Sequence, residues 1–244
     1  MKRTFLTIGL LLCCLMANAQ LNFTWELVPM DSAWDEIKDP AATNVILKYA
    51  DLLEPLQEII GYSTDEFDKY KPESGLSNFA ADAIRDISAS KCNCKVDIAM
   101  TNFGGIRASL PAGAVRVYDV LSIFPFDNFL VVFDITGRNL QEFLNNELKA
   151  NRLQALSNVQ LVINNGKFEK CLVDGAPIDP DRVYKFATIN FLMEGGDSVQ
   201  IGKYAQNVTN TDVFIRDAIV EYIKGMTERG EKIDLKEDGR VILK

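Results

Sequence analysis

Segments with the two-residue period of strands alternate along most of this chain with segments that have the period of amphipathic helices. Val96, Ile98 and Met100 are each separated by a single residue, as in a strand with one buried face. Other strands are predicted at residues 115–117, 129–135, 159–163, 168–173, 183–189 and 240–243. Strands and helices interleaved in this order predict an α+β fold, in which a mixed β-sheet carries packed helices.

The predicted helices place their apolar residues on one face. Apolar residues recur at helical spacing through residues 40–60, so a helix is expected there that ends at Gly61. Ser77 or Asn78 is expected to cap the next helix. Further helical segments are predicted at residues 118–124, 137–148 and 212–226.

The chain begins with the features of an export signal. Two basic residues precede an apolar run at residues 5–16, and Ala17-Asn18-Ala19 supplies the small residues that a signal peptidase recognises. We therefore expect residues 1–19 to be a signal peptide cleaved near Ala19, and the protein to be periplasmic or secreted. A membrane anchor is the alternative, but the run is shorter than the ~20 residues that span a bilayer.

Two parts are expected after the signal. Residues 20–39 have no regular period and are predicted to be irregular, with Trp25 and Trp34 as packing anchors. Residues 40–244 are predicted to form one domain that starts with a helical lead-in. Hydrophobic residues make up 48% of the sequence, which is enough for a core, and no later stretch is long and apolar enough to span a membrane.

The composition excludes several kinds of chemistry. The formal net charge is −8, so we expect an acidic surface and exclude nucleic acid as a ligand. The sequence contains no histidine. This chain therefore cannot use histidine for acid–base catalysis or as a metal ligand.

Three cysteines lie outside the predicted signal, at Cys92, Cys94 and Cys171. One residue separates Cys92 from Cys94, a spacing that strains a mutual disulfide, so either is open to pairing with Cys171. Three thiols without histidine match no common zinc spacing, and a structural role is favoured over a metal site. Lipid attachment to the two signal cysteines is disfavoured because bulky leucines precede them.

A glycine-rich loop follows the strand that contains Met100. Gly104 and Gly105 have no Cβ, so the backbone there can approach a ligand closely, and Asn102 stands at the end of the strand. Arg107 adds a cationic fork that suits phosphate or ribose oxygens. A tight turn with a surface arginine is the alternative.

Two further segments place a phenylalanine in a loop. Phe126 follows a proline that ends a helical turn, so we expect it to be exposed, whereas at least two of its neighbours Phe124, Phe129 and Phe133 belong to the core. Phe191 precedes Gly195, Gly196 and Asp197. Two loop aromatics suit a planar base held between them, and the aspartate suits two ribose hydroxyls. The alternative is a turn that Asp197 merely caps.

In order and spacing, these segments resemble the C-terminal, substrate-recognition domain of the 5′-nucleotidase and UDP-sugar hydrolase family. The resemblance starts near Leu53, is strong at residues 73–83 and runs to about Ile223. It implies that Phe126 and Phe191 hold the base. Two departures are Phe103, where a glycine is common, and Lys71 or Pro72, where some members have a second arginine.

The resemblance also assigns the polar contacts. Asn102 and Arg107 would contact the base and the sugar or phosphate oxygens, and Asp197 would accept the ribose hydroxyls. The substrate-binding residues implied are Asn102, Gly104, Gly105, Arg107, Phe126, Phe191, Gly195, Gly196 and Asp197. No catalytic residue is implied in this chain.

In the family, catalysis belongs to a metallophosphatase domain that holds two metals through aspartate, asparagine and histidine. Without histidine, this chain is expected to hold no metal or cofactor. The resemblance thus implies the nucleotide-recognition half of a split 5′-nucleotidase, with divalent metals in a separate metallophosphatase chain. The alternatives are a stand-alone nucleotide or nucleoside binding protein, a relic scaffold, and a hydrolase that holds a metal through Asp97, Asp127 and Asp197.

Overall fold

The computed structural model describes residues 24–27 and 40–244, without the side chains of residues 40, 42 and 46. The chain divides into two units, residues 1–49 and 50–244. In the first unit, helix α2 spans Pro40–Leu47. Trp25 is 75% exposed, so its predicted role as a packing anchor is wrong. The predicted signal peptide and Trp34 lie outside the described residues.

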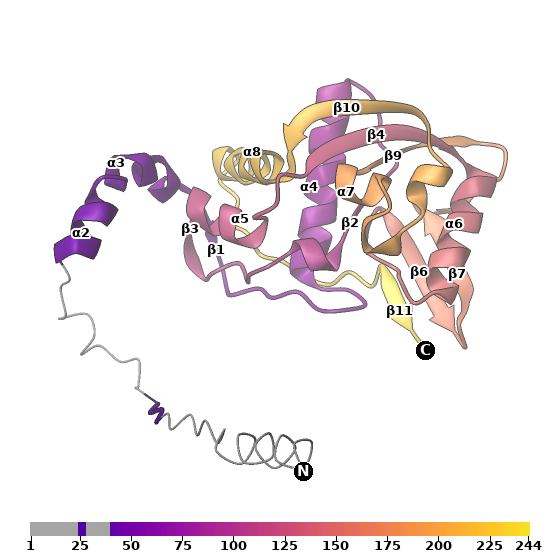
Figure 1. Ribbon diagram of the computed structural model, residues 1–244. Helices are drawn as coiled ribbons and strands as arrows, with labels where there is room; N and C mark the ends of the chain where they lie inside the picture. The colour runs from indigo at the N-terminus through magenta and orange to yellow at the C-terminus, as the bar shows by residue number, and fades with distance from the viewer. Residues whose placement is uncertain (1–23, 28–39) are drawn as a thin grey trace, which may run out of the picture. The chain divides into compact units, whose positions relative to one another are not determined.

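A five-stranded sheet forms the centre of the second unit (Figure 1). Its strands run in the order β10-β4-β9-β2-β5, with β2 and β9 parallel and the other pairs antiparallel. The sheet is therefore mixed, as predicted. The strands are β2 (Ile98–Thr101), β4 (Phe129–Thr136), β5 (Ala155–Ser157), β9 (Val183–Ile189) and β10 (Gln206–Phe214).

Two smaller sheets flank the central one. A four-stranded sheet joins β6 (Val159–Asn164), β7 (Lys167–Val173), β8 (Ala176–Pro177) and β11 (Val241–Leu243), and a two-stranded sheet joins β1 (Ile59–Ser63) to β3 (Gly113–Arg116). The turn between β6 and β7 has positive φ at Asn165 and Gly166, as an Asn-Gly hairpin turn requires. The strands predicted at residues 159–163 and 168–173 are confirmed, and they pair as a hairpin.

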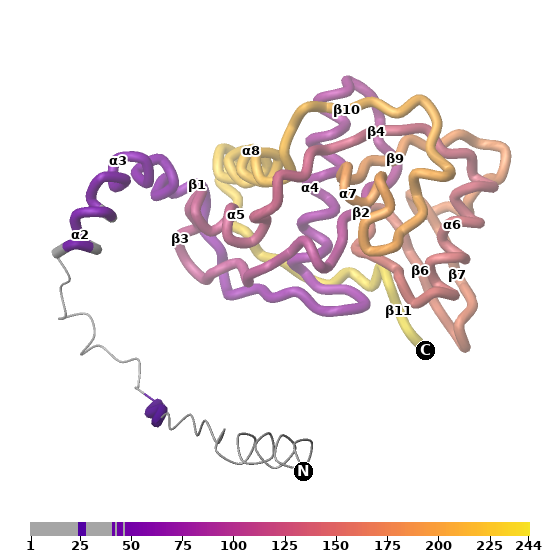
Figure 2. The backbone as a smooth tube through the Cα atoms, in the orientation of Figure 1, coloured from indigo at the N-terminus to yellow at the C-terminus, as the bar shows by residue number. Residues whose placement is uncertain are grey.

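Helix α4 (Gly75–Cys92) lies against the central sheet and also packs on α8 (Ile215–Glu228), as the tube in Figure 2 shows. The other helices are α3 (Ala50–Leu53), α5 (Val117–Ile123), α6 (Gly137–Lys149) and α7 (Asn190–Met193). Phe133 of β4 and Phe186 of β9 stack in the core with ring centroids 5.2 Å apart. Among the described residues, no helix is long and apolar enough to cross a membrane.

Two predicted helix boundaries are wrong near the start of the domain. Residues 40–60 are not one helix, because the segment breaks up after Leu47 and its last residues pair with β3 as strand β1, which contains Gly61. Helix α4 is capped by Ser74, not by Ser77 or Asn78. The Ser74 hydroxyl accepts from the backbone N–H of Ser77, and the Ser77 hydroxyl accepts from the N–H of Ser74.

The last helix begins later than predicted, because Val213 and Phe214 end strand β10. This strand pairs with β4 alone, at the edge of the sheet, and most of its residues are exposed. An edge strand with both faces largely in water carries no hydrophobic alternation, so its sequence pattern carried no signal for a strand.

The expectation that the spacing of Cys92 and Cys94 disfavours a mutual disulfide is also wrong. Cys92 and Cys94 form a disulfide, and Cys171 is unpaired. Asn93 between them has φ 49° and ψ 44°, the left-handed conformation that ends α4. This turn of the backbone brings the two cysteine Cα atoms to 5.2 Å, within the normal range for a disulfide.

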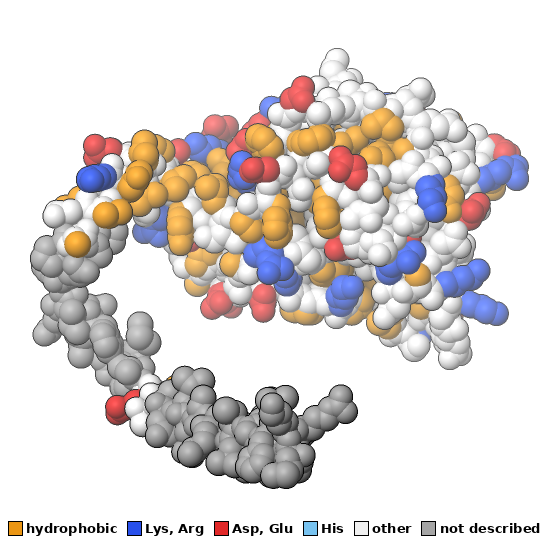
Figure 3. Space-filling model, in the orientation of Figure 1, with side chains coloured by type: hydrophobic (Ala, Val, Ile, Leu, Met, Phe, Trp, Pro, Cys, Tyr) orange, Lys and Arg blue, Asp and Glu red, His pale blue; other side chains and the backbone are white. Residues whose placement is uncertain are grey.

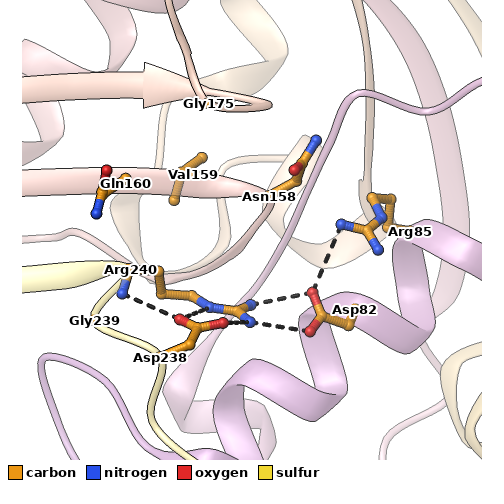
Figure 4. A pocket seen from close by; sticks show the side chains of 9 residues that line it. All are labelled: Asp82, Arg85, Asn158, Val159, Gln160, Gly175, Asp238, Gly239 and Arg240. Atoms are coloured by element: carbon orange, nitrogen blue, oxygen red, sulfur yellow. Dashed lines mark hydrogen bonds and ion pairs between the residues drawn. The ribbon is translucent and has the colours of Figure 1, made fainter.

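The C-terminal segment is tied to α4 by a buried arginine (Figure 4). Arg240 is 8% exposed, and its guanidinium donates to the carboxylates of Asp82 and Asp238 and to the carbonyl of Leu156. The hydrogen bond from Arg240 lowers the pKa of the Asp238 carboxyl. Asp82 belongs to α4, so the arginine fixes the strand β11 that follows it against the domain.

A buried glutamate reinforces the same connection. The Glu73 carboxylate accepts hydrogen bonds from the backbone N–H groups of Asp238, Gly239 and Val241, and from the amide of Asn78. Because Glu73 directly precedes the Ser74 cap, the start of α4 and the C-terminal segment share one polar network.

Replacing the arginine should destabilise the domain. Arg240→Met removes the cation that Asp82 and Asp238 share, and we expect the free energy of unfolding to fall by roughly 2–3 kcal/mol, less than the 3–5 kcal/mol of a fully buried pair because Asp238 is partly exposed. Asp238 has a lowered pKa, so the contribution is complete above the ordinary aspartate pKa of about 4 and is lost at lower pH. Urea unfolding measures both effects.

The matched control is Lys244→Met, which removes an exposed ion pair with Glu169 and should change stability little. Equal losses in the two variants, or a loss that grows as the pH falls, would contradict the role given to Arg240.

Cys171 should resist alkylation in the folded protein. Burial raises the pKa of its thiol to about 11, so little thiolate is present at pH 8. Mass spectrometry after iodoacetamide treatment should find the Cys171 peptide unmodified in native protein and modified in guanidinium chloride. Rapid modification of the native protein would show that the thiol is accessible.

Candidate functional site

The predicted site residues come together because of how three central strands are paired. Strands β2 and β9 are parallel neighbours, so their carboxyl ends lie at the same edge of the sheet, and β4 is antiparallel to β9, so its amino end lies there too. Asn102 directly follows β2, Phe191 is the second residue after β9, and Phe126 lies three residues before β4. Three loops distant in sequence thus meet at one edge.

These loops enclose a cavity of about 280 Å³. It is lined by Asn102, Gly104, Arg107, Phe126, Asn128, Phe191 and Asp197. Six of these residues are among those predicted from the sequence. Of the other predicted residues, Gly105, Gly195 and Gly196 belong to the same loops without lining the cavity.

The glycine-rich loop supplies the polar wall. Asn102 is 4% exposed, and its Nδ2 donates to Oδ2 of Asp197 at 2.7 Å. A Cβ at Gly105 would lie 2.5 Å from Oδ1 of Asn102, so a side chain there would displace the amide. Arg107 is exposed, and one of its guanidinium nitrogens donates to the carbonyl of Gly104 at 3.3 Å. Among the described residues no other hydrogen bond engages this guanidinium, so its remaining donors are open to a ligand.

Phe126 is 47% exposed, as predicted, whereas Phe124 and Phe133 are buried in the core. Its ring centre lies 6.0 Å from the Arg107 guanidinium carbon. The loop after it is fixed at two points: Arg216 forms an ion pair with Asp127, and the N–H of Ile215 donates to the carbonyl of Asn128. Helix α8 therefore holds the Phe126 loop.

Phe191 is 38% exposed on the opposite loop. A Cβ at Gly196 would lie 2.5 Å from two ring carbons of Phe191, so only glycine leaves room for the ring. Asn190, the residue before it, accepts a hydrogen bond from the N–H of Phe129. This bond joins the start of α7 to the start of β4, so the Phe126 and Phe191 loops are attached to each other.

Asp197 lies in a backbone conformation that non-glycine residues rarely adopt. Its φ is 52° and its ψ is 22°, and Ser198 beside it has φ 60°. Aspartate tolerates this region better than most residues, but two consecutive left-handed residues indicate a constrained turn. The carboxylate, with one oxygen bonded to Asn102, borders the cavity.

Sequence reasoning missed Asn128. It lines the cavity two residues after Phe126 and offers both a donor and an acceptor. The available signal was its place in the same short loop, directly before a strand. Because asparagine is common in turns, Asn128 could not be distinguished from an ordinary turn residue.

The three carboxylates considered for a metal do not form a cluster. Asp97 accepts hydrogen bonds from Arg182 and from the N–H of Lys185, Asp127 pairs with Arg216, and Asp197 accepts from Asn102. Each has a different partner, so this arrangement gives no support to a shared metal. Within residues 24–27 and 40–244, no group of three or more acidic or cysteine side chains is placed to hold a metal ion.

Larger pockets lie elsewhere on the domain but lack this combination of exposed aromatic rings and an available cation. The hollow around Arg240, of about 440 Å³, is lined by Asp82, Arg85 and Asp238, whose charges are bonded to one another (Figure 4). A ligand there would have to compete with those ion pairs. The smaller cavity has two exposed aromatic rings and a cation with free donors, which makes it the better candidate site.

The comparisons with known proteins identify the class. The family model described as "5′-nucleotidase, C-terminal domain" matches residues 59–204. The chain therefore belongs to this family, and the predicted resemblance is confirmed.

Individual relatives agree with this assignment. The trifunctional nucleotide phosphoesterase protein YfkN of Bacillus subtilis is 28% identical over 88% of this chain and 16% of its own length. The cell wall protein Lmo0130 of Listeria monocytogenes is 31% identical over 70% of this chain and 24% of its own length. The chain thus spans less than a quarter of either protein.

A solved structure shows the same fold. The 5′-nucleotidase precursor from Thermus thermophilus superposes with a TM-score of 0.70 and 24% identity, covering 83% of this chain and 43% of that one. The α+β fold with a mixed sheet is therefore that of 5′-nucleotidase C-terminal domains, as predicted.

The exposure of the two rings makes a prediction about stability. Phe126→Ala and Phe191→Ala should each lower the free energy of unfolding by much less than the roughly 3–5 kcal/mol lost when a buried phenylalanine is replaced, because both rings are already partly in water. Phe133→Ala, whose ring is fully buried, is the matched control and should show that full cost. Thermal and urea unfolding measure the stability of the three variants. Equal losses of stability would show that Phe126 and Phe191 belong to the core and not to an exposed site.

Proposed function

We propose that this domain recognises a nucleoside 5′-phosphate and presents it for hydrolysis by a separate metallophosphatase chain. The observation that carries the proposal is the meeting of two exposed phenylalanines from distant loops, Phe126 and Phe191, in one cavity with Arg107 and Asp197. A flat base, a diol and an anionic group are the ligand features that such a set suits.

Each part of the ligand has a matching group. A base between Phe126 and Phe191 would gain about 0.5–1.5 kcal/mol per aromatic contact beyond simple burial. Asp197 suits the ribose hydroxyls, and the exposed guanidinium of Arg107 suits the phosphate. Asn128 has the donor and acceptor needed to bind a base edge. At about 280 Å³, the cavity is near the small end of ligand pockets, as a single nucleoside requires.

The catalytic groups are assigned outside these 244 residues, which contain no histidine. The two-metal centre and the histidine acid of the family would then belong to the partner, which would supply the divalent metals. A stand-alone nucleotide or nucleoside binding protein is the second candidate. It is favoured by the set of groups that already line the cavity, because two aromatic rings, a guanidinium and a carboxylate suit a ligand without groups from a partner.

We also propose that the protein is exported and cleaved near Ala19. The support is the signal pattern of residues 1–19 and the similarity to a cell wall protein. Amino-terminal sequencing of the protein recovered from the cell envelope or medium tests this, because an uncleaved chain would begin at Met1.

The two candidate functions are separated by a reconstitution experiment. Calorimetry with AMP, UMP, adenosine and UDP-glucose first measures binding by the chain alone. Phosphate release from the bound nucleotide is then measured with manganese, with and without a metallophosphatase from the same organism that lacks a recognition domain. Turnover only in the mixture supports the split nucleotidase, and binding without turnover supports the binding protein. Absence of binding to all four ligands would overturn both.

Arg107 should distinguish nucleotides from nucleosides. Arg107→Ala removes charge-assisted hydrogen bonds to a phosphate, each of which contributes about 1.5–3 kcal/mol, so affinity for AMP should fall about 10- to 100-fold. Adenosine has no phosphate, and its affinity should change less than about threefold. Arg138→Ala, which removes an exposed arginine paired with Asp181, is the control and should change neither affinity. Equal losses for AMP and adenosine in Arg107→Ala would rule out the phosphate role.

A further inference from the structure

We propose that Asn102 is a positioning residue: by donating its amide to Asp197, it fixes the carboxylate that selects ribonucleosides over 2′-deoxyribonucleosides. This inference rests on the proposed function, because it assigns Asp197 to the sugar. It differs from the role implied by family resemblance, in which Asn102 contacts the ligand itself.

Asn102 is much more deeply buried than Asp197. Asn102 is almost fully buried at the end of β2, whereas Asp197 is exposed on the loop after α7. The amide nitrogen lies 2.7 Å from Oδ2 of Asp197, a hydrogen bond between residues 95 positions apart. The carboxylate therefore has one oxygen held by the core and one oxygen free to accept from a hydroxyl in the cavity.

The direction of the amide is fixed by this contact. If the amide were reversed, its oxygen would face the carboxylate oxygen and the two would repel each other. In the observed orientation, Oδ1 of Asn102 is buried without a hydrogen-bond partner among the described residues. A buried acceptor without a partner destabilises the fold, and a leucine of similar size would not have this penalty. The donor end of the amide accounts for the polar residue here.

The constrained backbone of Asp197 fixes the position of its Cα atom but not the rotation of its carboxylate. Asp197 and Ser198 are both left-handed, and within the described residues Asn102 is the group that hydrogen-bonds the Asp197 carboxylate. Without the amide, the carboxylate could rotate into water. Ribose selectivity would then fall although Asp197 itself was intact.

The hydrogen bond between Asn102 and Asp197 can be tested by changing the pH, because few other charged groups lie near it. Among the described residues, the only other charged side chain lining this cavity is that of Arg107, and Asp127 on the neighbouring loop is paired with Arg216. Asn102→Asp would replace the amide by a second carboxylate with nearly the same shape. At neutral pH the two carboxylates repel, but at lower pH they share one proton, and the resulting O–H restores a donor to Asp197.

The experiment is calorimetry with adenosine at pH 7.5 and pH 5.0, with uridine in parallel. Nucleosides are used because they have no phosphate that titrates in this range. Asn102→Asp should lose at least about tenfold in affinity at pH 7.5 and return to within about threefold of wild type at pH 5.0. Wild type should change by less than about threefold between the two pH values. Unchanged affinity at pH 7.5, or a loss that persists at pH 5.0 in a folded variant, would overturn the proposal.

A second variant covers the case in which Asn102→Asp does not fold. The hydroxyl of Asn102→Ser is too short to reach Asp197, so the ratio of adenosine to 2′-deoxyadenosine affinity should fall about fivefold or more. Asp197→Asn should lose the same discrimination at both pH values. If Asn102→Ser keeps the wild-type ratio, Asn102 does not act through Asp197. If wild type binds neither nucleoside, the proposed function fails and this inference fails with it.

Discussion

The pairing of β2, β9 and β4 in the central sheet is the constraint on which the candidate site depends. Parallel β2 and β9 end at the same edge, and antiparallel β4 begins there. Asn102, Phe191 and Phe126 are consequently gathered although they lie far apart in the sequence. The pairing itself is stabilised from within the sheet, where Phe133 of β4 stacks on Phe186 of β9 and both rings are fully buried.

Hydrogen bonds and ion pairs between elements then fix the loops at that edge. Arg216 of α8 holds the loop after Phe126, Asn190 joins the Phe191 loop to β4, and Asn102 holds Asp197. The two phenylalanine rings of the site, Phe126 and Phe191, are left partly in water. Figure 3 shows hydrophobic side chains interspersed with charged ones on the face of the domain that it draws. Loops that are already fixed lose little conformational entropy when a ligand binds, and this favours a high affinity.

Much of this arrangement could be predicted from the sequence because local patterns encode it. Strands β4 and β9 have clear apolar runs, and the Asn-Gly pair predicts the turn between β6 and β7. The segments that contain glycine and phenylalanine are distinctive enough to identify the family. What failed depends on tertiary context. Strand β10 is largely exposed and has no hydrophobic alternation. Residues 59–63 form a strand because β3 pairs with them, and the Cys92–Cys94 disulfide depends on the left-handed backbone of Asn93. The contribution of Asn128 and the Asn102–Asp197 bond could not be predicted, since both arise from loops that meet only in the folded chain.

We propose that a nucleoside occupies the cavity between Phe126 and Phe191, and a crystal structure of the chain grown with AMP would test this. The base should lie between the two rings, with the ribose hydroxyls at Asp197 and the phosphate towards Arg107. AMP bound in the hollow around Arg240, or a cavity without AMP at saturating concentration, would contradict it.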